Sequence, residues 1–175
     1  LYDTTPACLF GLNNEFISSG RLDDLSMACA GIDALLGSEV NDQTQIVAIF
    51  DNEETGSGTK QGAGSPFLAS IIERIVLAQR YDKEGFYRAI EQSFMVSADN
   101  AHAWHPNYPE KFDPTNHPVM GGGPAIKINA AQKYATDADG AAVFAEICRL
   151  AGVPSQTFVN HSDIAGGSTL GNILT

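Results

Sequence analysis

Hydrophobic positions along the chain follow two spacings, which predict a succession of helices and strands. Apolar side chains at helical spacing, with Pro or Gly at some of the ends, predict helices at residues 23–36, 66–80, 84–92 and 138–151. Short apolar runs predict strands at residues 45–50, 93–97, 125–129 and 157–160, and a short strand or loop at residues 15–19. Strands that alternate with helices indicate an α/β fold with a substantially parallel sheet.

One long segment, residues 104–123, interrupts this alternation. It contains four prolines and shows no periodicity. A loop of this length inside a compact domain is usually a functional loop or a covering lid. The sequence shows no internal repeat and no obvious linker, and its 175 residues indicate one domain.

Composition narrows the classes of partner. Lys and Arg number 10 and Asp and Glu 21, which gives a net charge of −11. This balance argues against a nucleic-acid backbone or an anionic membrane as partner and suits a protein that gathers carboxylates around cations. No apolar run approaches the roughly 20 residues of a membrane helix, and no signal peptide opens the chain. The chain begins with Leu1 rather than Met, so we expect a fragment.

The cysteines are three in number and lie far apart, which predicts free thiols rather than a disulfide framework or a Cys-zinc site. Free thiols packed as small hydrophobic groups are typical of a reducing compartment. We therefore expect a cytoplasmic protein.

Acidic residues gather where ligands bind in this class of fold. They are Glu53 and Glu54 after residues 45–50, Asp99 after residues 93–97, and Asp23 with Asp24 at the head of residues 23–36. Ligands of open α/β sheets lie beyond the carboxyl ends of the strands, so we expect these groups to converge. Clustered carboxylates repel one another unless cations offset them. Oxygen-rich ligands suit zinc, manganese or cobalt in hydrolases.

The adjacent glutamates would then divide the labour: one binds metal while the other takes a proton from a metal-bound water. Simpler interpretations stay open for each group alone. Asp23 and Asp24 are also typical of a helix cap, Glu53 and Glu54 of a solvated loop, and Asp99 of a turn.

A glycine-rich loop, residues 56–65, offers an alternative function, because it follows a predicted strand and precedes a helix as phosphate-binding loops do. A P-loop has Gly directly before its Lys, whereas here Thr59 precedes Lys60 and Gln61 follows it. The alternatives are thus a phosphate- or nucleotide-binding module that uses this loop, or a non-catalytic interaction domain. No Gly-x-Ser-x-Gly elbow of a serine hydrolase occurs.

Five stretches in order along the chain resemble the aspartyl aminopeptidase family, the zinc metallopeptidases of the aminopeptidase-I type. The family's motifs are R-L-D-N-L at residues 21–25, D-N-E-E-V-G-S at 51–57, S-A-D-M-A-H-A-x-H-P-N-Y at 97–108, G-P-x-I-K-x-N at 123–129 and S-D-x-x-G-G-S-T-x-G at 162–171. The resemblance implies a three-layer zinc-peptidase-like α/β core with a mixed, largely parallel sheet and flanking helices. It also implies a cytosolic enzyme that removes N-terminal Asp or Glu from peptides.

The resemblance assigns a role to six residues. Asp23 would bridge two zinc ions, Glu54 would bind one of them, and Asp99 would bind the other. Glu53 would be the general base and contact the substrate, and His102 and Lys127 would also contact the substrate. Asp24 stands where the family has Asn, which keeps the shape and adds a charge. Manganese or cobalt are alternatives to zinc.

The resemblance also implies that parts are missing. The family's zinc site uses a His before the first matching stretch and another after the last, and a dimerisation domain lends a third His to a neighbouring site. We therefore expect residues 1–175 to be a partial catalytic domain that lacks the family's N-terminal segment, dimerisation domain and C-terminal segment. Alone it is expected to be inactive, and the full-length parent is expected to be a homo-oligomer.

The other histidines, and Lys127 read by itself, have plainer interpretations. Pro106 follows His105 and ends any helix there, so His105 and the loop residue His117 are expected to be structural. His161 is interpreted as a surface or loop residue. Lys127 alternates with apolar neighbours in residues 125–129, which by itself predicts a solvent-facing strand position.

Overall fold

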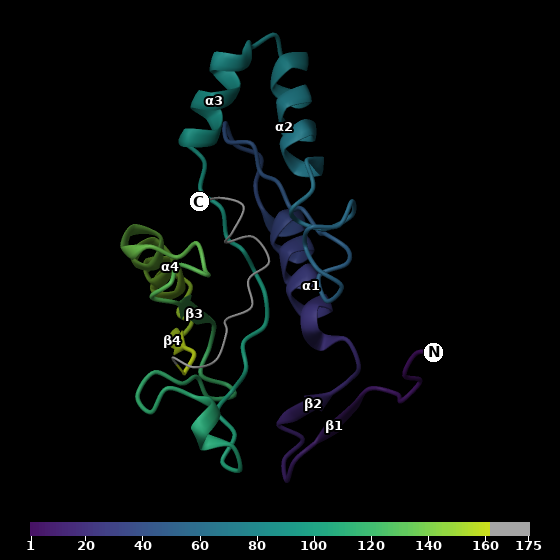
Figure 1. Ribbon diagram of the computed structural model, residues 1–175, viewed down its shortest axis with the longest axis vertical. Coiled ribbons are helices and arrows are strands. Elements are labelled where there is room, and N and C mark those ends of the chain that lie inside the picture. Colours follow the sequence, from purple (N-terminus) through teal and green to yellow (C-terminus); the bar gives the residue numbers. More distant parts are fainter. Residues whose placement is uncertain (162–175) are drawn as a thin grey trace. The chain divides into compact units, whose positions relative to one another are not determined.

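A computed structural model describes residues 1–161 of the chain, and its elements are drawn in Figure 1. The described residues divide into two compact units. The first contains Leu1–Ile49 together with the short segment Ala98–Asn100. The second begins with Phe50–Ser97 and resumes at Ala101. Each unit is described by itself below.

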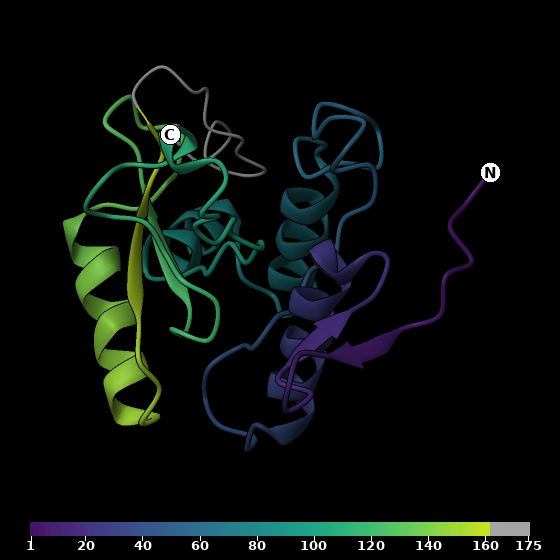
Figure 2. The same ribbon diagram turned by 90° about the horizontal axis from the view of Figure 1, so that it is seen from below.

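The first unit opens with a β-hairpin, in which β1 (Cys8–Phe10) pairs antiparallel with β2 (Phe16–Ser18), as Figure 2 shows. The rings of Phe10 and Phe16 stack across it with centroids 5.2 Å apart. The turn begins at Gly11, whose φ of 99° favours glycine, and a Cβ there would meet the Glu15 carboxylate. Residues 15–19, for which a short strand or a loop was predicted, contain the strand β2, whereas β1 was not predicted.

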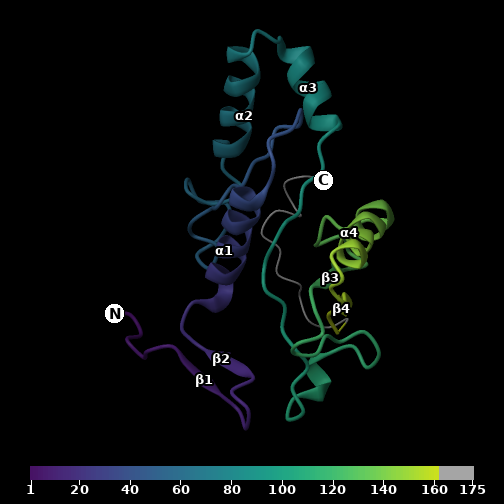
Figure 3. The same cartoon turned by 180° about the vertical axis from the view of Figure 1, so that it is seen from behind.

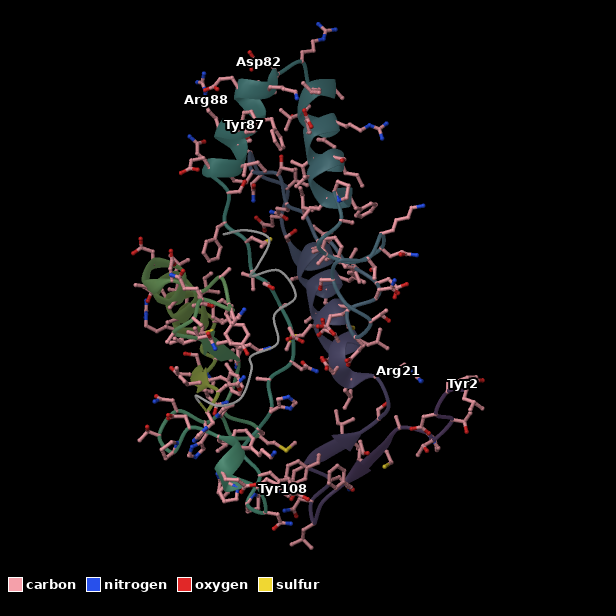
Figure 4. All side chains as sticks on the ribbon, viewed as in Figure 1. Tyr2, Arg21, Asp82, Tyr87, Arg88 and Tyr108 are labelled. Carbon is pink, nitrogen blue, oxygen red and sulfur yellow. The ribbon has the colours of Figure 1, made fainter. Side chains whose placement is uncertain are left out.

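Helix α1 (Leu22–Gly37) confirms the helix predicted at residues 23–36. Arg21, labelled in Figure 4, stands directly before the helix with a left-handed φ of 61°. Asp23 and Asp24 depart from helical dihedral angles, and the peptide bond between them is cis. The helix ends at Ser38, whose hydroxyl donates to the Leu35 carbonyl at 2.7 Å.

The second unit begins with a loop and a pair of helices, α2 (Phe67–Ala78) and α3 (Lys83–Glu91), which contact each other. Pro66 directly precedes α2, as its fixed φ favours. Asp82 caps α3 by accepting a hydrogen bond from the Gly85 N–H at 2.8 Å, and Figure 4 labels it beside Tyr87 and Arg88 of the same helix. Both predicted helices are confirmed, with ends shifted by one or two residues.

A parallel β-α-β unit follows further along the chain. β3 (Ala125–Ile128) pairs with β4 (Gln156–Val159), and α4 (Ala138–Leu150) connects them. Figures 1 and 3 show α4 beside this two-stranded sheet. The N-terminus of α4 is capped by Asp137, which accepts a hydrogen bond from the Gly140 N–H at 2.7 Å. These three elements confirm the predictions for residues 125–129, 138–151 and 157–160.

Residues 104–123 form a long loop, as predicted, with a single 3-10 turn, η1 (Pro109–Lys111). The loop is tied across itself, because the Trp104 N–H donates to the Pro118 carbonyl at 2.7 Å. Gln156 of β4 anchors its end: the side-chain amide accepts from the Val119 N–H at 2.8 Å and donates to the Gly123 carbonyl at 2.9 Å.

The α/β class is confirmed, but the sheets of the described chain are small. Two sheets of two strands each are present within residues 1–161, one antiparallel and one parallel. The strands predicted at residues 45–50 and 93–97 are absent there, and this prediction was wrong for the described chain. An apolar run predicts burial, whereas a strand also needs a neighbour to accept its backbone hydrogen bonds.

Few side chains are buried. Among the described residues the apolar core consists of Ala63, Cys148 and Phe158. Large apolar side chains on several elements stay exposed, including Leu25 of α1 at 60% and Ile49 at 54%. Within residues 1–161, no helix combines the length and the apolar character that crossing a membrane requires.

Candidate metal centre

Three carboxylates converge in the first unit. Asp23 and Asp24 lie at the start of α1, and Asp99 lies in the segment Ala98–Asn100. One carboxylate oxygen of each lies within 4.8 Å of the others. Asp23 is exposed, and Asp24 and Asp99 are half-buried. The structure thus brings together two of the three predicted ligands, Asp23 and Asp99.

The start of α1 departs from a regular helix. Arg21 occupies the N-cap position, and its side chain makes no capping hydrogen bond. Asp23 has a φ of −88° and a ψ of 109°, which takes its backbone out of the helical region. The interpretation of the acidic pair as a helix cap stays a prediction.

The donor set fits a divalent cation. Three carboxylates held this close repel one another, and a cation among them offsets that repulsion. Zinc accepts Asp oxygen ligands, and a set that consists of oxygen alone also suits manganese. No His or Cys joins this cluster within the described part of the chain.

A hydrogen-bonded network holds the segment of Asp99 to α1. The Asn100 side-chain amide donates to the Leu22 carbonyl at 3.0 Å and to the Ser26 hydroxyl at 3.1 Å. The Ser26 hydroxyl in turn donates to the Leu22 carbonyl at 2.7 Å. Two residues of this network are sequence neighbours of the carboxylates: Leu22 precedes Asp23, and Asn100 follows Asp99.

Glu53 and Glu54 lie in the second unit, in an exposed turn that follows Asn52. Asn52 has a left-handed φ of 64°, and its carbonyl accepts from the Gly56 N–H at 2.8 Å. Its side-chain amide donates to the Thr59 hydroxyl and to the side-chain oxygen of Gln61, each at 3.3 Å. These bonds shape the turn that presents both glutamates. Their predicted roles as base and ligand stay predictions.

The glycine-rich loop is closed on its own backbone. The Gly64 N–H donates to the Ser57 carbonyl at 2.8 Å, and the Gly62 N–H donates to the Thr59 carbonyl at 3.2 Å. The Ser65 N–H likewise donates to the Gly62 carbonyl at 3.0 Å. A phosphate cradle needs N–H groups that point at the ligand, so this arrangement does not favour the phosphate-binding alternative.

Two histidines of the long loop make the structural contacts expected of them. The His105 ring accepts from the Asn107 N–H at 3.2 Å, and its centroid lies 5.2 Å from that of Tyr108, which Figure 4 labels. The His117 ring lies 2.8 Å from the Asp113 carbonyl and packs against Trp104 with centroids 5.7 Å apart.

The predicted substrate contacts also belong to the second unit. His102 is exposed, and Lys127 is half-buried at the centre of β3, opposite Phe158 of β4. The Lys127 ammonium lies 5.8 Å from the centre of the Tyr134 ring, within the range of a cation–π interaction. Lys127 is therefore held over an aromatic face rather than fully extended into solvent. His161 is half-buried, and the rest of its predicted motif, residues 162–171, lies outside the described residues.

Asp24 is the residue of the cluster that sequence reasoning did not assign. It was interpreted as a harmless replacement of the family's Asn, yet its carboxylate belongs to the group formed with Asp23 and Asp99. Its adjacency to Asp23 was the available signal. Side chains at successive helical positions normally point in different directions, and the non-helical backbone here removes that expectation.

Comparison with known proteins identifies the family of the chain. The profile of the family described as Aminopeptidase I zinc metalloprotease (M18) matches residues 1–175. The chain belongs to this family. A probable M18 family aminopeptidase 2 of Clostridium acetobutylicum is 56% identical over 173 residues, which cover 99% of this chain and 40% of that protein.

Solved structures of related proteins share the fold. The cryo-EM structure of the complex of Ape4 and Nbr1 aligns with a TM-score of 0.87 at 38% identity, over 98% of this chain and 34% of that one. The mApe1 dodecamer of S. cerevisiae aligns with a TM-score of 0.80 at 29% identity, over 99% of this chain and 39% of that one. The chain thus spans about two fifths of the length of its curated relatives.

Proposed function

We propose that this chain contributes part of the catalytic centre of a zinc-dependent aminopeptidase. The observation that carries the proposal is the convergence of Asp23, Asp24 and Asp99 in a chain of the M18 family. The family description names a zinc metalloprotease, and the clustered carboxylates supply ligands that such a metal accepts.

The resemblance to the family assigns the roles. Asp23 would serve both of two zinc ions, Asp99 would help to hold one of them, and Glu54 would help to hold the other. Bound zinc would polarise the scissile carbonyl and lower the pKa of a water molecule. Glu53 accepts the proton of that water and delivers it to the leaving amine. Manganese or cobalt would fit the same oxygen ligands.

The preferred substrates are peptides with Asp or Glu at the N-terminus. Lys127 supports this part of the proposal, because a half-buried ammonium attracts a carboxylate more strongly than one in bulk water does. His102 contributes a second polar contact to the substrate. The free cysteines of the chain support a reducing compartment, and we place the enzyme in the cytoplasm.

The chain by itself is expected to bind zinc weakly and to show no turnover. If Asp23 were shared between two zinc ions, each ion would have only two of the predicted ligands Asp23, Glu54 and Asp99, one fewer than catalytic zinc usually keeps. The active form is proposed to be a homo-oligomer, in line with the mApe1 dodecamer. The exposed apolar side chains of α1 and of residues 45–50 suit burial against further polypeptide.

Removal and return of metal in the full-length gene product tests the proposal. A chelator should abolish release of chromophore from an Asp-linked substrate, and zinc, manganese or cobalt should restore it. The same substrate with a blocked amino group serves as the matched control and should stay intact. Activity that survives complete metal removal, or a zinc-loaded protein that cleaves neither an Asp-linked nor a Leu-linked substrate, would refute the proposed function.

A further inference from the structure

The hydrogen-bonded network between α1 and the segment Ala98–Asn100 joins parts of the chain that are far apart in sequence. Ser26 and Asn100 are 74 positions apart, and Leu22 and Asn100 are 78 apart. Asn100 uses both protons of its amide nitrogen, one on the Leu22 carbonyl and one on the Ser26 hydroxyl. The Ser26 hydroxyl lies 2.7 Å from the Leu22 carbonyl and 3.2 Å from the Asn100 side-chain oxygen, so that it has an acceptor on each of the two segments.

The network lies next to two of the clustered carboxylates in the sequence. Leu22 directly precedes Asp23, and Asn100 directly follows Asp99. The bonds therefore fix the backbones of two acidic residues whose side chains repel each other. Without them, the segment Ala98–Asn100 would be free to move away from the start of α1, because like charges favour separation.

We propose that Ser26 and Asn100 are positioning residues of the metal centre. They hold Asp99 beside the acidic start of α1 before the cation arrives, so that less binding energy is lost in ordering the ligands. Neither belongs to the group of carboxylates that could hold a metal ion, and both act through the backbone next to Asp23 and Asp99. This inference rests on the proposed function, because it assumes that the carboxylates bind metal.

Zinc affinity of the full-length gene product, measured by competition with a chromophoric chelator, tests the proposal. Asn100→Leu keeps the size of the side chain and removes both bonds, and Ser26→Ala removes the hydroxyl. Each change should weaken zinc binding about tenfold, the lower end of the effect of residues that orient metal ligands. The double variant should lose little more than Asn100→Leu alone, because the two side chains act as one unit.

Two variants separate positioning from general stability. Ser38→Ala removes an equivalent hydroxyl-to-carbonyl bond of 2.7 Å at the other end of α1 and should leave zinc affinity unchanged. Ser26→Thr keeps the hydroxyl and should restore the affinity that Ser26→Ala loses. The visible spectrum of the cobalt-substituted protein should change in Asn100→Leu and stay unchanged in Ser38→Ala, because it reports on the arrangement of the ligands.

The outcomes are distinguishable. Wild-type zinc affinity in Asn100→Leu and Ser26→Ala, with an unchanged cobalt spectrum, would overturn the inference and leave the proposed function standing. An equal loss in Ser38→Ala would also overturn it, since the effect would then be one of helix stability. A full-length protein that binds no zinc at all would refute the proposed function and this inference together.

Discussion

Asp113 and the Asp23–Asp24–Asp99 cluster show two ways in which a protein accommodates carboxylates. Asp113 accepts from the backbone N–H groups of Thr115 and Asn116 at 2.9 Å and 2.7 Å, within three residues of itself. These donors lower its pKa to about 2. The cluster instead places three carboxylates together from distant parts of the chain. Local N–H donors stabilise a carboxylate without a cation, whereas clustered carboxylates favour the binding of a cation between them.

The comparison separates structural from functional acids. An Asp whose oxygens are occupied by its own turn shapes a loop, and the bonds that do so can be expected from the spacing D-x-T-N alone. An Asp gathered with others at long range is held in place by the rest of the fold. Four predictions test this distinction, from the largest expected effect to the smallest.

The adjacent glutamates give the largest expected effect. In the full-length protein, Glu53→Gln should lower kcat at least ~10²-fold while zinc content stays the same, because the amide cannot accept the proton and the residue is not a ligand. Glu54→Gln, its matched control, should lose zinc as well as activity. Near-normal turnover in Glu53→Gln would remove this residue from the mechanism, and unchanged zinc content in Glu54→Gln would remove that ligand.

The same substitution, Asp to Asn, is made once in the carboxylate cluster and once in the loop of Asp113, to compare their effects on zinc binding. Asp99→Asn removes a charge and should weaken zinc binding on the order of 10²-fold, at or above the upper end of the effects of residues that orient metal ligands. Asp113→Asn makes the same chemical change within the loop and should leave zinc affinity alone. Chelator competition measures both. Equal losses would mean that net charge, rather than placement, governs binding.

Much of the fold was predictable from the sequence, and the exceptions share a physical cause. Helices α1 to α4 were predicted because their hydrogen bonds are local and their apolar spacing lies within each segment. Residues 45–50 and 93–97 read as strands, yet pairing depends on a neighbour that no local pattern specifies. β1 has three residues, too few to show alternation.

The candidate site was also predictable in part from the sequence. Asp23 and Asp99 were singled out from their positions beside predicted elements and from the motifs that they belong to. Asp24 received no role, because it stands where the family has Asn and was expected only to add a charge. The Ser26–Asn100 network could not be foreseen, since no rule of local sequence pairs residues 74 positions apart.

The third prediction concerns a positively charged residue, Lys127. Lys127→Met in the full-length protein should reduce kcat/KM for Asp- and Glu-linked substrates about tenfold more than for a Leu-linked substrate, the effect of losing a charge-assisted contact. Lys111→Met, on an exposed turn, is the matched control and should change neither. An equal loss on all substrates would make Lys127 a general scaffold residue rather than a determinant of specificity.

Acid titration of the Asp113 loop gives the smallest effect. A carboxyl whose folded pKa is lowered stabilises the folded loop above its ordinary pKa of 3.8, and this contribution is lost as pH falls toward about 2. Trp104, the only tryptophan, packs on His117, whose ring contacts the Asp113 carbonyl, so its fluorescence reports on this loop. Asp113→Ala should loosen the loop at pH 7, and its difference from wild type should persist down to about pH 4 and then vanish near pH 2. Other carboxyls titrate in both proteins, so the difference between them isolates Asp113. A difference that stays constant through this range would show that the Asp113 hydrogen bonds do not stabilise the loop through the charged form.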